Sequence, residues 1–431
     1  MDAEARKKEL KEVKSTNARI QMTGIPLRYR GSTITENVYK IPLSYLVYNK
    51  YNGRIGTEVK SYEVQNGELN VETEHDKKKI EEFLYNSKRD RNKKTMDSLL
   101  KDGQQRYGIV TADGKIVDGN RRAMLLNTLF NEREKLGYSY SQVEKCQYFL
   151  AIILPEDATE KDMQQLETIY QMGEDDKLDY NAIEKYLKCK ELKKYFSEKD
   201  IAEFMGESEK QIIKKLSILN LMEEYLETYG YTGIYTRLEK TEGPFVDLDG
   251  YLESYKKGGA NVSGVDWPYD ELDINELKII CFDYIRARYE GKEFRDIAKT
   301  GKDGSIFAHK DIWESFKALH MEKVPEDEFT TDELREKFPN EDLSNLLKSR
   351  DADWTKKARG ELEGNLRKHS SKVDDKRNAS KPLELLEKAL SALNSVDTNQ
   401  SSFFEDENVV QCIKDISKIS WEMKKLLDRK C

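Results

Sequence analysis

The spacing of hydrophobic and polar residues divides the chain into an N-terminal mixed part and a long helical part. Alternating positions begin at Val38 and predict a short strand through KIPLSYLVYN, which runs into the turn-rich NKYNGR. Helical spacing then covers residues 76–86 and 95–101, with the basic run KRDRNKK between them. The stretch RYGIVTADGKIVDGNRRAMLLNTLF predicts strand, Asp-Gly hairpin, strand, glycine loop and helix, and CQYFLAIIL predicts another strand. We therefore expect an α/β unit over residues 38–155, after a charged leader (1–37) made of a helix and an irregular stretch.

Helical spacing dominates the remainder. We expect a helical domain over 156–230, in which SEKDIAEFMGESEKQIIKKLSILNLMEEYLE forms two helices joined by a turn at Gly206. Residues 231–370 are predicted to be mainly helical and without an assigned role, although 231–270 is rich in Gly, Tyr and Asp and favours a boundary or a long connection. Residues 371–431 are predicted to be a polar linker, around HSSKVDDKRNASKP, and two amphipathic helices that form a hairpin or a dimer interface.

Composition narrows the classes of protein. Of 431 residues, 73 are Lys or Arg and 81 are Asp or Glu, which gives a net charge of −8. This charge argues against coating nucleic acid by bulk attraction, so any DNA contact requires a local basic face. No apolar run approaches the ~20 residues of a membrane helix, and the charged N-terminus is not that of a signal peptide. We expect a cytoplasmic protein with no membrane partner.

Cysteine and histidine usage indicates neither a disulfide framework nor a zinc site. The five Cys show no close pairing and the four His show no metal-ligand spacing. This composition is compatible with a magnesium ion that is carried on a nucleotide.

The most informative stretch is the loop between the second predicted strand of the hairpin and the helix after it. The strand ends at Asp118, Gly119 permits a sharp turn, and the helix starts with Asn120, Arg121 and Arg122. A helix start offers unpaired N–H groups and a positive dipole end, and two guanidinium groups beside them favour an anion site. The alternative is that both arginines pair with acidic side chains of the same chain.

The order of the motifs resembles the N-terminal domain of the chromosome-partitioning protein ParB and its relatives, which share a fold with sulfiredoxin. Asn49, Tyr51, Asn52 and Arg54 look like the family's first motif, Gly103 with the two glutamines after it looks like the second, and VDGNRR looks like the phosphate loop. The resemblance implies an α+β ParB/sulfiredoxin-like domain, then an all-α helix-turn-helix region and a mainly helical C-terminal part. It also implies a nucleoside triphosphate, ATP or CTP, with Mg²⁺. The residues that it assigns to the nucleotide are Asn52, Arg54, Gln104, Gln105, Gly119, Asn120, Arg121 and Arg122.

Several positions depart from the family pattern. Arg106 stands where Pro is usual, and Asn120 stands where sulfiredoxin has its nucleophilic Cys, so reductase chemistry is not supported. In the family's third nucleotide motif, Gln171 and Asp175 stand at the positions of a Glu and an Arg. Glu167 takes the position of that Glu only if the alignment contains an insertion. This motif therefore identifies no ligand for the magnesium ion.

The two helices around Gly206 have the signature of a helix-turn-helix. Ser197 and Ser208 are N-cap residues, and Gly206 permits a steep crossing. The residues expected to face DNA lie at the start of the second helix: Ser208, Lys210, Gln211, Lys214 and Lys215. A hairpin with solvated lysines is the alternative, although the position directly after a ParB-like domain is the family's own arrangement.

The leading hypothesis is a bacterial, ParB-like, nucleotide-responsive DNA-binding protein that forms a homodimer through its C-terminal helices. An alternative is an ATP-consuming phosphotransferase or NTP hydrolase of the same fold in a DNA-modification or phage-defence system. Asp118 is then the candidate general base or metal contact, unless it only shapes the turn. A third hypothesis is that the C-terminal 160 residues hold a protein partner.

Overall fold

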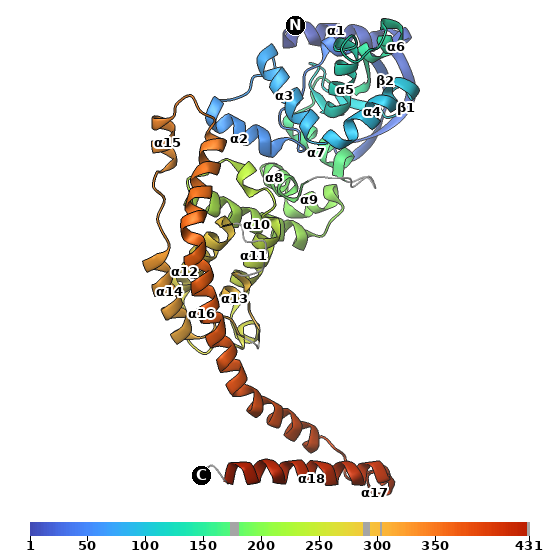
Figure 1. Cartoon of the computed structure of the whole chain (residues 1–431). Coiled ribbons are helices and arrows are strands. Elements are labelled where there is room, and N and C mark those ends of the chain that lie inside the picture. Colours follow the sequence, from blue (N-terminus) through green and yellow to red (C-terminus); the bar gives the residue numbers. More distant parts are fainter. Residues whose placement is uncertain (173–180, 288–293, 302–303, 429–431) are drawn as a thin grey trace. The chain divides into compact units, whose positions relative to one another are not determined.

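The computed structural model describes residues 1–172, 181–287, 294–301 and 304–428 (Figure 1). It forms two compact units, Met1–Leu366 and Arg367–Cys431, and each is described by itself.

The first unit opens with a five-stranded mixed sheet. Its strands are β1 (Ile20–Tyr29), β2 (Ser32–Pro42), β3 (Gly108–Val110), β4 (Ile116–Asp118) and β5 (Tyr148–Ile153). The order across the sheet is β1-β2-β5-β3-β4; β3 and β5 are parallel, and the other neighbours are antiparallel. A mixed α/β N-terminal part followed by helices, as expected, is confirmed.

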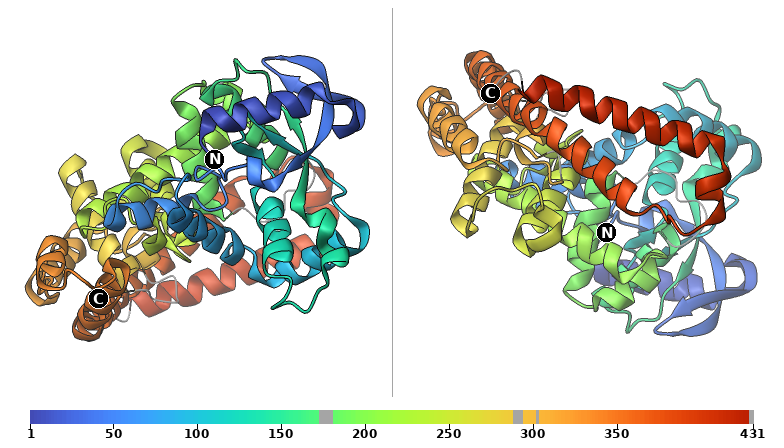
Figure 2. Two further views of the ribbon diagram at one scale, coloured as in Figure 1. Left: turned by 90° about the horizontal axis from the view of Figure 1, so that it is seen from above. Right: turned by 90° about the horizontal axis from the view of Figure 1, so that it is seen from below.

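Helices cover both faces of this sheet. They are α1 (Ala3–Ser15), α2 (Gly56–Asn66), α3 (Glu74–Asn86), α4 (Arg89–Asp102), α5 (Asn120–Asn131), α6 (Tyr140–Val143) and α7 (Glu160–Met172). Successive strand residues point to opposite faces, so Ile116 joins the core under α1, α3 and α5, whereas Val117 joins the core that contains Leu166 of α7. Figure 2 shows α1 beside the β1–β2 hairpin. The phosphate-loop candidate therefore lies at the end of a strand held between two layers of helices.

The N-terminal segment differs from the expectation. Residues 20–37 are not irregular: β1 pairs with β2, which begins before Val38 and ends at Pro42. Leu10 and Val13 of the leader helix are buried in the core of the α/β unit. Register shifts between Ile20 and Ile25 interrupt the alternation, which is why the pattern did not indicate a strand. The basic run KRDRNKK, which lay outside the predicted helical spacing, is mostly helical, because α4 begins within it at Arg89.

The rest of the first unit is helical. Its α-helices are α8 (Ala182–Lys193), α9 (Glu198–Met205), α10 (Glu209–Thr228), α11 (Glu242–Lys257), α12 (Glu271–Arg286), α13 (Phe294–Ala298), α14 (Lys310–Lys323) and α15 (Thr331–Lys337). The expected connection at 231–270 contains α11, which buries Phe245, Leu248, Leu252 and Tyr255. These four residues follow one another at steps of three or four positions, which is helical spacing. The glycines of this stretch led to the interpretation as a connection instead.

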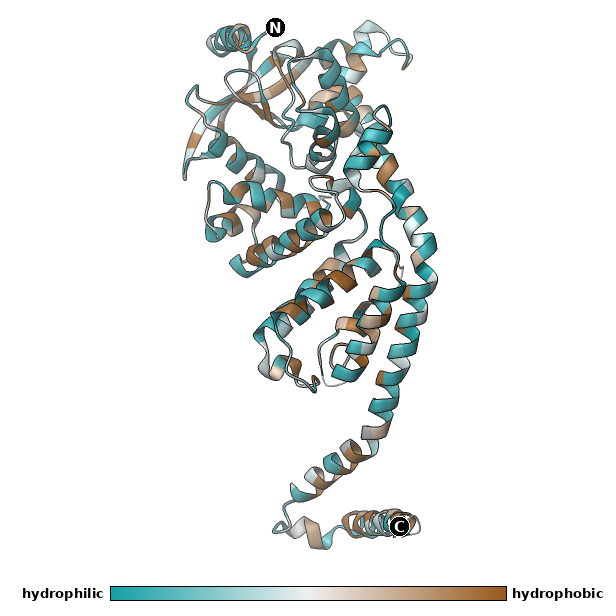
Figure 3. Cartoon of the chain, turned by 90° about the vertical axis from the view of Figure 1, so that its left-hand side faces the viewer, coloured by the Kyte–Doolittle hydropathy of each residue, from teal (hydrophilic) through white to brown (hydrophobic). Residues whose placement is uncertain are grey.

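The C-terminal helices are α16 (Leu343–Asn394), α17 (Ser401–Glu405) and α18 (Glu407–Asp428). The predicted polar linker is helical, because it lies inside α16 together with Pro382. Its polarity indicated exposure and was wrongly interpreted as an absence of helix. Polar and apolar residues are interspersed along these helices (Figure 3). Among the described residues, no helix has both the length and the apolar character needed to cross a membrane.

Candidate anion-binding site

Gly119 sets the geometry of the loop between β4 and α5. Its φ of 101° lies in the left-handed region, and it is the N-cap of α5. A Cβ at this position would lie 2.7 Å from Cζ of Phe149, so a side chain has no room. Among the described residues no side chain caps the start of α5, so its first N–H groups lack a helical partner and the positive end of the helix dipole lies there.

Within the part of the chain that the structure describes, Arg121 and Arg122 donate hydrogen bonds only to neutral groups. Nε of Arg121 donates to Oδ1 of Asn92 at 3.1 Å, and its Nη2 donates to Oγ1 of Thr95 at 3.4 Å. Nη1 of Arg122 donates to the carbonyl oxygens of Arg106 at 2.7 Å and Tyr107 at 3.3 Å. Within the described ranges, neither arginine forms an ion pair with a carboxylate. The alternative in which acidic side chains of the chain neutralise both is therefore not observed there.

Burial and neighbouring cations both act on these guanidinium groups. Burial lowers the pKa of Arg121, and the positive charges of Arg54 and Arg91 lower it further. Burial also lowers the pKa of Arg122, with Arg106 and Arg54 acting in the same direction and Asp118 against them. Both remain charged at any physiological pH. A bound anion would relieve this repulsion.

These groups surround a hollow of about 410 Å³ at the start of α5. Its lining residues are Asn52, Arg54, Thr95, Arg106, Asp118, Gly119, Asn120, Arg121, Arg122 and Gln171. Four of them are arginines and one is a carboxylate, so the hollow is locally positive in a protein of net charge −8. The structure therefore brings together the first predicted motif and the phosphate loop.

Asn120 and Asn52 hold this arrangement from inside. Asn120 is buried: its Oδ1 accepts from the backbone N–H of Asn49 at 2.8 Å, and its Nδ2 donates to the carbonyl of Ile116 at 3.1 Å. Oδ1 of the buried Asn52 accepts from the N–H of Arg54 at 3.1 Å. Both asparagines therefore position the backbone of the loop that carries Arg54.

A buried ion pair fixes the same loop from the other side. The N–H of Gly53 donates to Oε1 of Glu167 at 2.9 Å, and Oε2 of Glu167 lies 2.7 Å from Nζ of Lys188. Glu167 and Lys188 belong to α7 and α8. Two helices that follow the sheet in sequence thus support the loop of the first motif.

The second motif is not brought into the hollow. Nε2 of Gln104 donates to the carbonyl of Leu150 at 2.7 Å and its Oε1 accepts from the N–H of the same residue at 2.8 Å. Nε2 of Gln105 donates to the carbonyl of Asp102 at 2.5 Å. Thr95, Arg106 and Gln171 line the hollow instead. The sequence signal for Thr95 was only that of a polar residue in the second turn of α4.

Asp118 is the carboxylate of the hollow. Its Oδ1 accepts from Nε2 of Gln171 at 3.2 Å. Among the described residues no three His, Cys, Asp or Glu side chains form a metal-binding group. The residues present therefore fit Mg²⁺ only as an ion held between Asp118 and the phosphate oxygens of a ligand. Asp175 of the third motif lies outside the described residues.

The two helices around Gly206 have the expected caps. Gly206 ends α9 in the left-handed region, and Ser197 and Ser208 both form capping boxes. In the second box, Oε1 of Gln211 accepts from the N–H of Ser208 at 2.8 Å, so these two predicted DNA contacts also satisfy each other.

The predicted DNA-facing lysines differ in their surroundings. Lys214 is paired with Asp249 of α11, and Lys215 is paired with Glu207. Lys210 is exposed at the start of α10. The local positive charge on this helix is therefore smaller than the sequence suggested.

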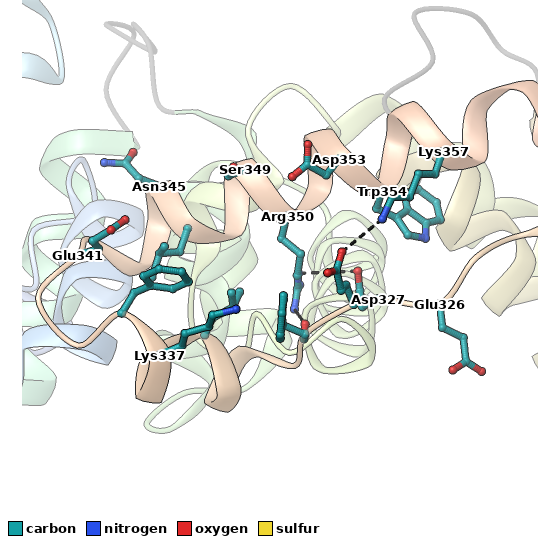
Figure 4. A pocket seen from close by; sticks show the side chains of 15 residues that line it. Glu326, Asp327, Lys337, Glu341, Asn345, Ser349, Arg350, Asp353, Trp354 and Lys357 are labelled. Carbon is teal, nitrogen blue, oxygen red and sulfur yellow. Dashed lines mark hydrogen bonds and ion pairs between the residues drawn. The ribbon is translucent and has the colours of Figure 1, made fainter.

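A hollow of about 370 Å³ lies between α15 and α16 (Figure 4). Arg350 points toward Asp327, 3.8 Å away, and Lys357 lies 3.3 Å from Glu328. Because Arg350 and Lys357 already face carboxylates and Lys337 lies over the ring of Phe329, this hollow favours no single class of ligand.

No protein-family model, curated protein or solved structure matches the chain. The geometry of the site is therefore the basis for the proposal below.

Proposed function

We propose that this protein binds a nucleoside triphosphate, with the phosphates in the hollow at the start of α5. The observation that carries the proposal is the pair Arg121 and Arg122, which share one helix start and have no carboxylate partner among the described residues. Free N–H groups, a helix dipole and guanidinium forks at one point are the features that bind phosphate. The resemblance to ParB-like domains supports the same ligand.

Magnesium would enter with the nucleotide. Asp118 would offer it a carboxylate oxygen, while Gln171 holds the other side of that carboxylate. Whether the bound nucleotide is also hydrolysed is the enzyme alternative. We expect phosphate release, if present, to be lost in Asp118→Asn, whose amide still accepts the hydrogen bond from Gln171.

Isothermal titration calorimetry with ATP, CTP and GTP in magnesium tests the binding. We expect at least a hundredfold loss of affinity in the double variant Arg121→Ala, Arg122→Ala, because two charge-assisted contacts of about 1.5–3 kcal/mol each are removed. Arg133→Ala is the matched control, because Arg133 follows the same helix and lies outside the hollow. Absence of binding of any nucleotide to the unaltered protein would show that the proposal is wrong.

We propose DNA as a second ligand, on the strength of the capped helix pair around Gly206. Lys210→Glu should weaken a salt-dependent mobility shift, with Lys8→Glu on α1 as a control of equal charge change. The shift should also change when nucleotide is added. Equal shifts for both variants would argue against α10 as the recognition helix.

A further inference from the structure

A second hollow adjoins the first. It measures about 320 Å³, at the lower end of the ~300–1,000 Å³ usual for small-molecule pockets. Its lining residues are Arg54, Glu58, Asn86, Ser87, Lys88, Asn181 and Glu184. They come from the loop of the first motif, α2, the end of α3 and the start of α8. Arg54 lines both hollows, so a ligand that reaches past it would occupy the two together.

Glu184 is the unusual residue of the second hollow. It is 7% exposed, and its Oε2 accepts from the N–H of Asn181 at 3.2 Å as part of a capping box. Its Oε1 has no hydrogen-bond partner within the described part of the chain, and it is not one of the fully buried unpartnered atoms, so it is accessible from the hollow. Glu58 lines the same hollow, and its carboxylate accepts from Oγ1 of Thr57 at 2.7 Å.

Glu184 shares its hollow with one other carboxylate, Glu58, and with two cations, Arg54 and Lys88. Burial, with the nearby carboxylate of Glu58, raises the pKa of Glu184 to about 8. Burial also raises the pKa of Glu58. Neither carboxylate forms an ion pair within the described ranges. Carboxylates of this kind in a hollow are typical of a ligand site.

We propose that the second hollow binds the sugar of the nucleotide, with Glu184 and Glu58 accepting hydrogen bonds from the sugar hydroxyl groups. This inference rests on the proposed function, because the phosphates must occupy the first hollow. The first hollow has four arginines and one carboxylate, whereas the second has two carboxylates with Arg54 and Lys88. The phosphates therefore favour the first hollow, and the O–H donors of the sugar find carboxylate acceptors in the second. The ligand is therefore oriented, with Arg54 at the point where phosphate and sugar meet.

Calorimetry with three probes separates this inference from the proposed function. Inorganic triphosphate measures the first hollow alone, ATP measures both hollows, and 2′,3′-dideoxy-ATP lacks the sugar hydroxyls. We expect ATP to bind at least about tenfold more tightly than triphosphate. Dideoxy-ATP should lose most of this gain in affinity. Glu184→Gln keeps a residue suited to the capping box. In this variant the affinity for ATP should fall about five- to tenfold, while the affinity for triphosphate should not change.

The controls decide between the possible failures. Glu132→Gln, on the exposed C-cap of α5, should bind all three probes as the unaltered protein does. If triphosphate binds but ATP gains nothing, or Glu184→Gln binds ATP normally, the sugar site is wrong and the phosphate site stands. If triphosphate does not bind, the phosphate site itself is wrong. If CTP binds more tightly than UTP and removal of the hydroxyls has no effect, a base amino group occupies the hollow, which overturns the sugar assignment.

A pH series gives an independent readout. An ionised carboxylate is the stronger acceptor, so the advantage of ATP over triphosphate should grow between pH 6 and pH 9. It should grow less in Glu184→Gln, in which Glu58 is the remaining carboxylate of the hollow. The charged groups that face Glu184 are Glu58 of α2, Arg54 of the loop and Lys88 between α3 and α4, which are the same in both proteins. An advantage that does not change with pH in the unaltered protein would overturn the role of Glu184.

Discussion

At the scale of single residues, the candidate site depends on a few side chains whose surroundings are unfavourable without a ligand. Arg121 and Arg122 lie close to other cations, and Glu184 is buried next to another carboxylate. Each arrangement costs folding free energy, because a charge is partly removed from water and has a like charge nearby. Such costs are typical of sites whose partner is supplied by binding.

Gly119→Ala tests the turn itself. The left-handed φ and the contact with Phe149 predict a loss of about 1–3 kcal/mol in the free energy of unfolding, measured by urea titration. Gly360→Ala in α16 is the control: its Cβ would meet open space, and we expect a gain of about 0.5–1 kcal/mol. Equal urea midpoints for the two variants would contradict the strain assigned to Gly119.

At the scale of secondary-structure elements, the loop that carries Arg54 is held by contacts between distant parts of the chain. Asn120 of α5 accepts a hydrogen bond from the N–H at the start of this loop. Glu167 of α7 accepts a hydrogen bond from the N–H of Gly53 and forms an ion pair with Lys188 of α8. The position of Arg54 therefore depends on the helices after the sheet as well as on the sheet. Removing one member of this ion pair should affect both stability and ligand binding.

Lys188→Met leaves the carboxylate of Glu167 buried without its cation. We expect a loss of about 3–5 kcal/mol in the free energy of unfolding, and weaker nucleotide binding because the loop is released. The double variant Glu167→Leu, Lys188→Met removes both charges and should recover most of the stability without recovering the binding. If the double variant is no more stable than Lys188→Met, the pair is not the reason for the loss.

Local signals were sufficient to predict part of these elements. Ser197, Gly206 and Ser208 were identified because a cap depends on residues within one turn of the helix. The turn at Gly119 was identified for the same reason. The strand β1 was missed because its pairing with β2 is irregular, and the burial of Glu184 was missed because it depends on α2, which is distant in sequence. Gln104 resembled a ligand contact, but its amide bonds the backbone of β5, which only the sheet topology reveals.

At the scale of the whole molecule, charge and apolar surface are unevenly distributed. A protein with net charge −8 places four arginines around one hollow. In the second unit, α18 exposes large apolar side chains, among them Ile419 and Leu426. Val409, Cys412, Ile416, Ile419, Met423 and Leu426 recur at alternating steps of three and four residues. Such spacing is typical of helices that associate, and the homodimer remains our prediction.

Sedimentation equilibrium of the full chain tests this association. The unaltered protein should have the mass of two chains. Ile419→Asp with Leu426→Asp should have the mass of one, because charges within an apolar helix contact prevent pairing. Lys418→Asp, outside the apolar stripe, is the control and should remain dimeric. A single-chain mass for the unaltered protein would exclude a homodimer.

Phe149 links two glycines that are distant in sequence. A Cβ at Gly108 would collide with its ring, as would one at Gly119, so a single aromatic side chain on β5 restricts both positions. Glycine should therefore be hard to replace at both positions. A smaller residue at 149 would relieve only part of the restriction at Gly108, because a Cβ there would also lie 2.6 Å from the backbone oxygen of Asp118, and Gly119 would be retained for its backbone angle.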